Sequence, residues 1–250
     1  MTDTNSTTLT IPSFSFPDIQ VSGNRVERFG RRSFELAVSI AATDNADIVV
    51  CKSPIGGDFS QFYIVKSKRV CTSHLEGYPV LYTLKPSSFK ALVVESELRW
   101  LNHPLTKLND LKPTQIAKSW QNQFMFKAED KESDTMGLRT PQIGALHAIS
   151  AEFSRSANIE PSTVVLPTGT GKTETMLATT IYHRCDKVLV LVPSNSLRDQ
   201  IGDKFKTLGC LAELGVVPEE ILHPAVVKIK KGIKTVEEAQ KLLDSASVLV

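Results

Sequence analysis

The sequence predicts an α/β protein, with a parallel sheet of the doubly wound type preceded by a smaller β-rich or α+β domain. After residue 136, short apolar runs alternate with helical patterns, which is typical of strand–helix repeats. Residues 187–192 (KVLVLV) are continuously apolar, as in a strand covered on both faces. Before residue 127, β-like runs are instead separated by glycine, proline and aspartate. The chain therefore divides into two parts of different texture.

The N-terminal part predicts a small domain at residues 21–126. Residues 1–20 are rich in serine and threonine and contain two prolines, so a flexible tail is expected there. The expected strands are 34–40, 47–51, 62–66, 80–84 and 91–94, and a helical pattern follows at 116–126. Residues 127–134 (KAEDKESD) are charged or small, which predicts a linker at 127–136.

The C-terminal part, residues 137–250, predicts the α/β sheet. Capping residues define two of its helices, because Ser194 suits an N-cap and Thr235 with Glu238 suits a capping box. The expected helices are 141–155, 172–183, 195–208 and 236–243, and the expected strands are 164–166, 187–192, 225–229 and 247–250.

Residues 166–173 (LPTGTGKT) predict a phosphate-binding loop between a strand and a helix. Gly169 and Gly171 allow backbone N–H groups to turn toward phosphate oxygens, and the following helix directs its N-terminal N–H groups at the same anion. Lys172 can reach the β- and γ-phosphates, and the Thr173 hydroxyl can ligate Mg²⁺. The general pattern has glycine where this chain has Leu166, and the alternative is an ordinary glycine-rich turn.

Two flanking segments accompany this loop, namely residues 137–143 (GLRTPQI) and 191–200 (LVPSNSLRDQ). Together, the three segments resemble the first RecA-like lobe of superfamily 2 helicases. The similarity is greatest to the DEAD/DEAH-like group that includes the motor subunit of type III restriction enzymes. It covers residues 138–200 firmly and the rest to 250 loosely.

The resemblance implies an ATP and Mg²⁺ site. It implies that Gln142 reads the adenine edge, since an amide offers both a donor and an acceptor. The alternative is a Gln142 that merely faces solvent. Phe124 or Phe126 could stack on the adenine, although a core role is the alternative for both. The implied nucleotide-binding residues are Pro167, Thr168, Gly169, Thr170, Gly171, Lys172, Thr173, Glu174, Arg139 and Gln142.

The resemblance also implies a nucleic-acid contact at the corner after residue 192. Pro193, Ser194, Ser196 and Arg198 fit this role, because helix N-terminal N–H groups, hydroxyls and arginine are natural phosphate partners. The alternative is a capped helix with solvated charges. The basic run 228–234 could line a nucleic-acid path or simply protect a strand edge.

A motor of this class also needs a carboxylate pair at the end of a later strand and arginines from a second lobe. No apolar run after Thr173 ends in Asp-Glu. We therefore interpret the chain as the N-terminal fragment of a longer protein, with an incomplete lobe that lacks the DExH motif.

Composition limits the other possibilities. The net charge of +2 places any nucleic-acid binding in a local site. The four cysteines form no CxxC pair, which argues against zinc. No apolar run is long enough to span a membrane and the N-terminus does not look like a signal peptide, so a cytoplasmic protein is expected.

The sequence thus predicts the ATP-binding part of an ATP-dependent helicase or translocase. DNA is favoured over RNA as its partner, with a nuclease or defence-system protein as a possible second partner. One alternative is a P-loop NTPase that does not act on nucleic acid. Another is a truncated nucleotide-binding module without turnover.

Overall fold

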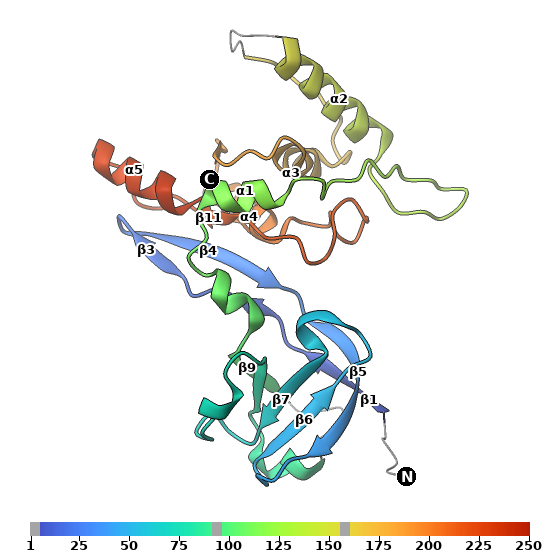
Figure 1. The fold of residues 1–250 in the computed structure, drawn as a ribbon. Coiled ribbons are helices and arrows are strands. Elements are labelled where there is room, and N and C mark those ends of the chain that lie inside the picture. The colour runs from blue at the N-terminus through green and yellow to red at the C-terminus, as the bar shows by residue number, and fades with distance from the viewer. Residues whose placement is uncertain (1–5, 92–96, 156–160) are drawn as a thin grey trace. The chain divides into compact units, whose positions relative to one another are not determined.

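The computed structural model describes residues 6–91, 97–155 and 161–250 (Figure 1). The chain forms two compact units. Unit 1 contains Met1–Phe16 and Gly30–Asp110, and unit 2 contains Pro17–Phe29 and Leu111–Val250. The predicted boundaries, at residues 20/21 and 126/127, therefore differ from the structural division.

Unit 1 is built on a six-stranded sheet with the order β1-β5-β6-β7-β8-β9. Neighbouring strands are antiparallel except for the parallel pair β7–β8. Its strands are β1 (Ser6–Ile11), β5 (Phe34–Ala42), β6 (Ile48–Lys52), β7 (Gln61–Val65), β8 (Val80–Thr83) and β9 (Leu98–Asn102), and the short β2 (Phe14–Ser15) lies in the same unit. The 3-10 turns are Gly57–Phe59, Ser73–Leu75, Pro86–Ala91 and Pro104–Leu108.

Most of the expected strands of this unit are confirmed. The prediction of a flexible tail is wrong for residues 6–11, because β1 pairs along its whole length with β5. Leu9 and Ile11 alternate with threonines and are buried, so the serine- and threonine-rich composition concealed a strand of period two. Of the expected strand 91–94, residues 92–94 lie outside the described residues.

Unit 2 has a sheet with the order β10-β12-β11-β4, and β3 pairs with β4. The pairs β10–β12 and β12–β11 are parallel, as an α/β sheet requires, while β4 adds an antiparallel strand. The strands are β3 (Ile19–Val21), β4 (Asn24–Arg31, continuing into unit 1), β10 (Val188–Leu189), β11 (Ala225–Val227) and β12 (Val248–Leu249). The helices are α1 (Pro113–Ser119), α2 (Thr140–Arg155), α3 (Lys172–Tyr182), α4 (Asn195–Thr207) and α5 (Val236–Ser245).

The N-terminal hairpin β3–β4 is part of this second sheet. Asn24 at its turn is 3% exposed, and its carboxamide oxygen accepts hydrogen bonds from the backbone N–H groups of Lys230 and Lys231, each at 2.9 Å. Glu27 on β4 forms a 2.7 Å ion pair with Lys206 on α4. Residues 17–29 were expected in the tail and the accessory domain, but they fold with the C-terminal part instead.

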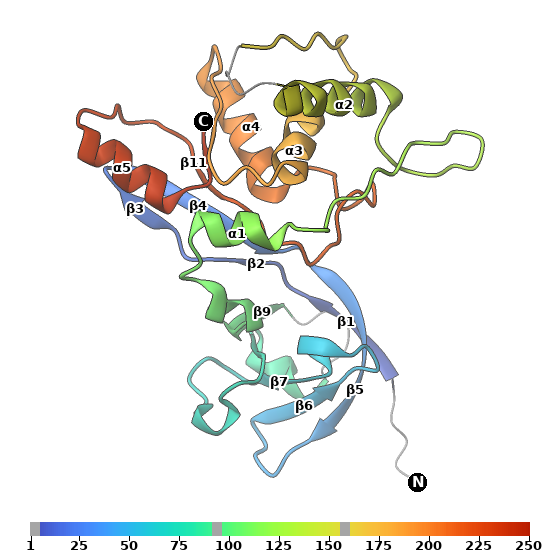
Figure 2. The same ribbon diagram turned by 45° about the horizontal axis from the view of Figure 1, so that its top comes forward.

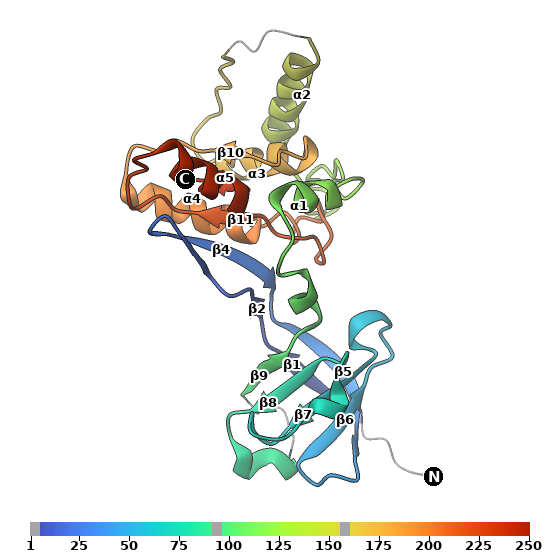
Figure 3. The same cartoon turned by 60° about the vertical axis from the view of Figure 1, so that its left-hand side comes forward.

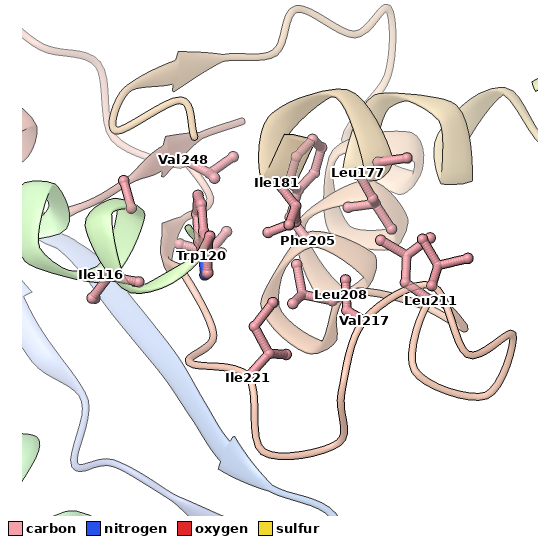
Figure 4. Packing of buried hydrophobic residues seen from close by; sticks show 14 of the residues in the cluster. Ile116, Trp120, Leu177, Ile181, Phe205, Leu208, Leu211, Val217, Ile221 and Val248 are labelled. Carbon is pink, nitrogen blue, oxygen red and sulfur yellow. The ribbon is translucent and has the colours of Figure 1, made fainter. Parts of the chain in front are cut away.

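The helices follow the sequence pattern closely. The Ser194 hydroxyl accepts from Leu197 N at 3.2 Å, and the Thr235 hydroxyl accepts from Glu238 N at 3.2 Å, so both predicted N-caps are confirmed. Figure 2 shows α2 beside α3, and Figure 3 shows β11 near α4. The core of unit 2 forms where α1, α3 and α4 converge, and in Figure 4 Ile181, Phe205 and Leu208 point toward one another.

Trp120 extends this core. Its side chain is 1% exposed, and its indole N–H donates to the Leu222 carbonyl at 2.7 Å. This bond satisfies the only polar group of the indole and fixes α1 against the loop that precedes β11.

The prediction of a linker at 127–136 is wrong. Backbone bridges join Ala128 with Leu138 and Asp130 with Thr135, so the segment folds back on itself. Leu138 is fully buried and anchors the returning arm. The charged composition of residues 127–136 therefore does not indicate a lack of structure.

The predicted strand at 164–166 is also wrong, since residues 161–167 belong to no strand or helix. Val165 is 85% exposed. On the other side, the apolar run 187–192 yields only the two-residue edge strand β10, with Leu191 also 85% exposed. β10 pairs with β12 on one side only. Within the described residues, no strand pairing joins residues 161–167 to residues 187–192.

Candidate nucleotide site

The phosphate loop leads directly into α3. Gly169 and Gly171 have φ angles of +82° and +84°, a region that side chains rarely adopt, so glycine is needed at both positions. Gly171 occupies the N-cap of α3, where no side chain caps the helix. The N-terminal N–H groups of α3 are thus directed at the loop and suit an anion.

The carbonyl of Pro167 closes the loop. It accepts a hydrogen bond from the Thr170 hydroxyl at 2.7 Å and from the Lys172 ammonium at 2.9 Å. Lys172 is exposed, and an ammonium group has three donors. It can therefore turn to a phosphate at little cost. Thr173, beside it in the first turn of α3, is half-buried, and its hydroxyl is the group that suits Mg²⁺.

Gln142 joins the start of α2 to the loop. It is 4% exposed, its amide donates to the Gly171 carbonyl at 3.1 Å, and its oxygen accepts from Arg139 N at 2.8 Å. The alternative of a solvent-facing Gln142 is therefore wrong. These bonds use one N–H and one lone pair, so the amide retains a second of each for a base edge.

Arg139 supports the other glycine of the loop. Its guanidinium donates to the Gly169 carbonyl at 2.6 Å and lies 3.6 Å from a carboxylate oxygen of Glu129. Arg139 and Gln142 thus each bind the carbonyl of one loop glycine. The structure thus places both residues beside the predicted phosphate-binding loop.

A cavity of about 480 Å³ adjoins the loop, a volume within the usual range for small-molecule sites. It is lined by Glu129, Asp130, Lys131, Asp134, Thr135, Met136, Gly137, Arg139, Gln142, Gly169, Gly171, Glu174, Cys210 and Leu214. The residues from 129 to 137 and after 209 were missed by sequence reasoning. Gly137 was the signal in the sequence that could have indicated a close backbone contact. In the structure, a Cβ at Gly137 would lie 2.4 Å from the Ala128 carbonyl carbon.

Glu174 contributes a carboxylate to the lining of this cavity. Burial by itself would raise the pKa of the Glu174 carboxyl. The hydrogen bond and charge of Lys204, a backbone hydrogen bond and the charge of Arg139 together outweigh burial and hold that pKa below its usual value. The carboxylate pairs with the Lys204 ammonium, so α3 and α4 are tied together beside the phosphate loop.

Neither candidate for stacking on a base lines this cavity as the structure describes it. Phe124 packs against the core of unit 2 and meets Phe126 edge-on at 5.1 Å. Phe126 is 42% exposed and stacks on His147, with ring centroids 5.1 Å apart.

The predicted nucleic-acid corner is only partly free. Pro193, Ser194 and Ser196 are exposed at the N-terminus of α4. Arg198 has a side chain only 16% exposed, and its guanidinium donates to the Ile229 carbonyl at 3.0 Å. Its bond to β11's C-terminal extension gives Arg198 a structural role in unit 2.

The charges of the basic run are also partly neutralised. Lys228 lies 2.6 Å from Asp203, and Lys230 lies 3.8 Å from Asp199. Among residues 6–91, 97–155 and 161–250, no group of three potential metal ligands occurs and no helix is long and apolar enough to cross a membrane.

Sequence comparison agrees with these motifs. Residues 135–241 match the family described as "Type III restriction enzyme, res subunit". The match covers less than half of the chain, and it includes the phosphate loop, Arg139, Gln142 and the corner after residue 192. It supports the similarity of this segment to superfamily 2 helicases that its motifs indicate.

Two curated relatives support the same class. Reverse gyrase 1 of Sulfurisphaera tokodaii is 35% identical over 73 residues, which is 29% of this chain and 6% of that protein. Reverse gyrase 2 of Sulfolobus acidocaldarius is 32% identical over 90 residues, covering 32% of this chain and 8% of that protein. The chain spans less than a tenth of the length of these relatives, and no solved structure matches it significantly.

Proposed function

We propose that this chain is the ATP-binding part of an ATP-dependent helicase or translocase. The observation that carries the proposal is the phosphate loop at the start of α3, held by Arg139 and Gln142 beside a cavity of nucleotide size. The helicase-like match over residues 135–241 supports it.

Within this proposal, each residue has a defined task. Thr168, Gly169, Thr170 and Gly171 direct backbone N–H groups at the triphosphate. Pro167 has no N–H and supports the loop through its carbonyl. Lys172 neutralises the β- and γ-phosphates, and the Thr173 hydroxyl ligates Mg²⁺. Glu174 holds Lys204 next to the loop, and Gln142 bonds the adenine edge with its remaining donor and acceptor.

Mg²⁺·ATP fits the residues that are present. No side-chain or backbone atom lies within 4 Å of a Cβ built on Gly169, so the loop has open space on that side. The metal would be bound through the nucleotide phosphates together with Thr173, and it would neutralise phosphate charge there.

The nucleic-acid partner belongs to the proposal as well. Ser194, Ser196 and Arg198 would contact a phosphate backbone at the N-terminus of α4, with Pro193 shaping the corner. DNA is the favoured partner, and a role in restriction or defence with a nuclease partner is the proposed setting.

The bond from Arg198 to Ile229 favours the alternative, a P-loop NTPase whose corner is purely structural. The two functions differ in one measurement. If the protein is a helicase or translocase, duplex or single-stranded DNA should stimulate ATP turnover by the full-length protein. If it is a P-loop NTPase that does not act on nucleic acid, DNA should leave ATP turnover unchanged. A third reading, a nucleotide-binding module without turnover, predicts no hydrolysis even with nucleic acid.

The basic test is nucleotide binding by this chain, measured by calorimetry with Mg²⁺·ATP. The wild-type chain should bind, and Lys172→Ala should lose most of the affinity, because this lysine is the main side-chain charge over the β- and γ-phosphates. Equal binding by the two proteins would overturn the assignment of the phosphate loop. A turnover assay should show no hydrolysis by the chain alone, since it lacks an Asp-Glu strand end after Thr173.

A further inference from the structure

The segment between residues 127 and 138 is an ordered loop. Leu138 N donates to the Lys127 carbonyl at 2.7 Å, and Glu129 N donates to the Leu138 carbonyl at 2.9 Å. Nearer the tip, Asp130 and Thr135 exchange backbone hydrogen bonds of 2.9 and 2.8 Å. These four bonds fix the loop without any regular strand.

The tip of this loop is capped from within. The Asp130 carboxylate accepts from the Ser133 hydroxyl at 2.7 Å and from Glu132 N at 2.9 Å. These hydrogen bonds hold the pKa of Asp130 below its usual value. Both oxygens of Asp130 thus serve the turn. Glu129 lies at the base of the loop, where it contacts Arg139.

The loop is also anchored at both ends. Met125 N donates to the Val216 carbonyl at 2.8 Å, and the Leu138 side chain is fully buried in the core of unit 2. Gly137 packs against Ala128 so closely that any side chain would collide with its backbone. A loop held this firmly can position a side chain for recognition.

The loop forms one wall of the cavity beside the phosphate loop. Glu129 and Met136 line it from this wall, and Leu214 lines it from the segment after α4. Met136 is 56% exposed, so its side chain is accessible to a group bound in the cavity. The thioether of a methionine packs well on an aromatic ring.

We propose that Glu129 is a base-specificity residue that accepts a hydrogen bond from the 6-amino group of adenine, while Met136 covers one face of the purine. This inference rests on the proposed function of the site. A carboxylate is only an acceptor, so it attracts the amino group of adenine and repels the 6-oxo group of guanine. Arg139 lies 3.6 Å from one oxygen, Oε2, of Glu129, so the other oxygen remains for the base.

Glu129 lies outside the matched family segment, which begins at residue 135, so the family match assigns it no role. Its position is nevertheless tied to the phosphate loop, because Arg139 contacts Glu129 and donates to the Gly169 carbonyl. The same guanidinium therefore links Glu129 to the loop that would hold the phosphates.

The test is a thermodynamic cycle with the 250-residue chain and two ligands, ATP and purine riboside triphosphate, which lacks the 6-amino group. Calorimetry gives four dissociation constants, for wild-type and Glu129→Gln. The wild-type chain should bind ATP about 10- to 100-fold more tightly than the analogue, as for a hydrogen bond to a charged group. Glu129→Gln should lower this ratio, leaving only the discrimination that Gln142 supplies, and should bind GTP more tightly than the wild-type chain does.

Glu132→Gln is the matched control, because Glu132 lies on the same loop but does not line the cavity. It should keep the wild-type ratio. An unchanged ratio in Glu129→Gln would overturn the inference, and so would an equal loss of affinity for both ligands, since Glu129 would then only support Arg139. If Glu129→Gln fails to fold, the wild-type ratio still decides: a ratio near one overturns the inference. Failure of the proposed function looks different, because Lys172→Ala would then bind ATP as tightly as wild-type.

Discussion

The amide nitrogen of Gln142 lies 3.1 Å from the carbonyl oxygen of Gly171 and joins the start of α2 to the phosphate loop. The contact is close enough that a Cβ on Gly171 would lie 2.2 Å from that nitrogen. Gln142 therefore shapes the loop in addition to its proposed contact with adenine. In the proposed function the loop binds phosphate through its backbone, so this bond would link base recognition to phosphate binding.

Gln142→Ala should weaken the binding of inorganic pyrophosphate as well as that of ATP. The loss should be about tenfold for pyrophosphate, since the Gly171 carbonyl would lose a buried hydrogen bond and the loop its support. Competition against a fluorescent ATP analogue measures both ligands. Gln121→Ala, at an exposed position after α1, serves as the control. Unchanged pyrophosphate affinity in Gln142→Ala would show that Gln142 does not support the loop.

Gly171→Ala should be much more damaging than Gly169→Ala. Both residues have φ angles above +80°, where alanine costs roughly 1–2 kcal/mol. Only Gly171 has a neighbour, Gln142, in the space that the methyl group would fill. We expect Gly171→Ala to abolish nucleotide binding and to lower the melting temperature beyond the decrease in Gly169→Ala. Calorimetry and thermal denaturation of the two variants provide the measurement, and similar losses would contradict the predicted clash.

The ion pair between Glu174 and Lys204 predicts a dependence of stability on pH. The folded state holds the pKa of Glu174 below its ordinary value of 4.5. The stabilisation is therefore fully present above pH 4.5 and is lost as the pH falls through the lower, folded pKa. Lys204→Met should be less stable than wild-type near neutral pH. The difference in the free energy of unfolding should shrink below pH 4.5, as urea titrations at several pH values would show. A difference that stays constant with pH would argue against the pair.

Arg198→Ala should have two separate effects. Loss of the hydrogen bond to the Ile229 carbonyl should lower the melting temperature. If Arg198 also contacts a phosphate, the slope of log affinity against log salt should fall by about one unit for DNA. Ser196→Ala tests the corner more cleanly, because Ser196 is exposed and Ser194 provides the N-cap. It should reduce DNA affinity without changing the melting temperature. A lower melting temperature with an unchanged salt slope would leave Arg198 purely structural.

The features that could be predicted from the sequence are those that depend on a few neighbouring residues. Helix caps at Ser194 and Thr235 and the glycines of the phosphate loop are encoded within a few residues, and the structure has them where predicted. Residues 17–29 could not be placed this way, because the antiparallel pairing of β4 with β11 joins segments about 200 residues apart. The sequence did not predict the cavity wall at 129–137. Backbone hydrogen bonds hold this segment in place, and amino-acid composition does not reveal such bonds.

The last prediction concerns the exposed apolar edge between residues 161–167 and β10. Val165 and Leu191 are each 85% exposed and Leu189 is 65% exposed, whereas monomeric soluble proteins rarely leave such apolar groups clustered. The nearby cavity of about 520 Å³ is lined by both segments, including Val164, Leu166, Val188, Leu189, Val190 and Leu191. An unpaired apolar strand edge promotes association with other chains.

The chain should therefore self-associate, and Leu191→Lys combined with Val165→Lys should suppress the association, since lysine protects strand edges. Val236→Lys is the matched control, because Val236 is 79% exposed but lies at the start of α5, away from this edge. Sedimentation velocity over a range of concentrations would measure the effect. Nucleotide binding should be retained in the double variant, since neither side chain lines the cavity beside Gln142. A wild-type chain that remains monomeric at every concentration, or a control that suppresses association equally well, would show that this edge is not an association surface.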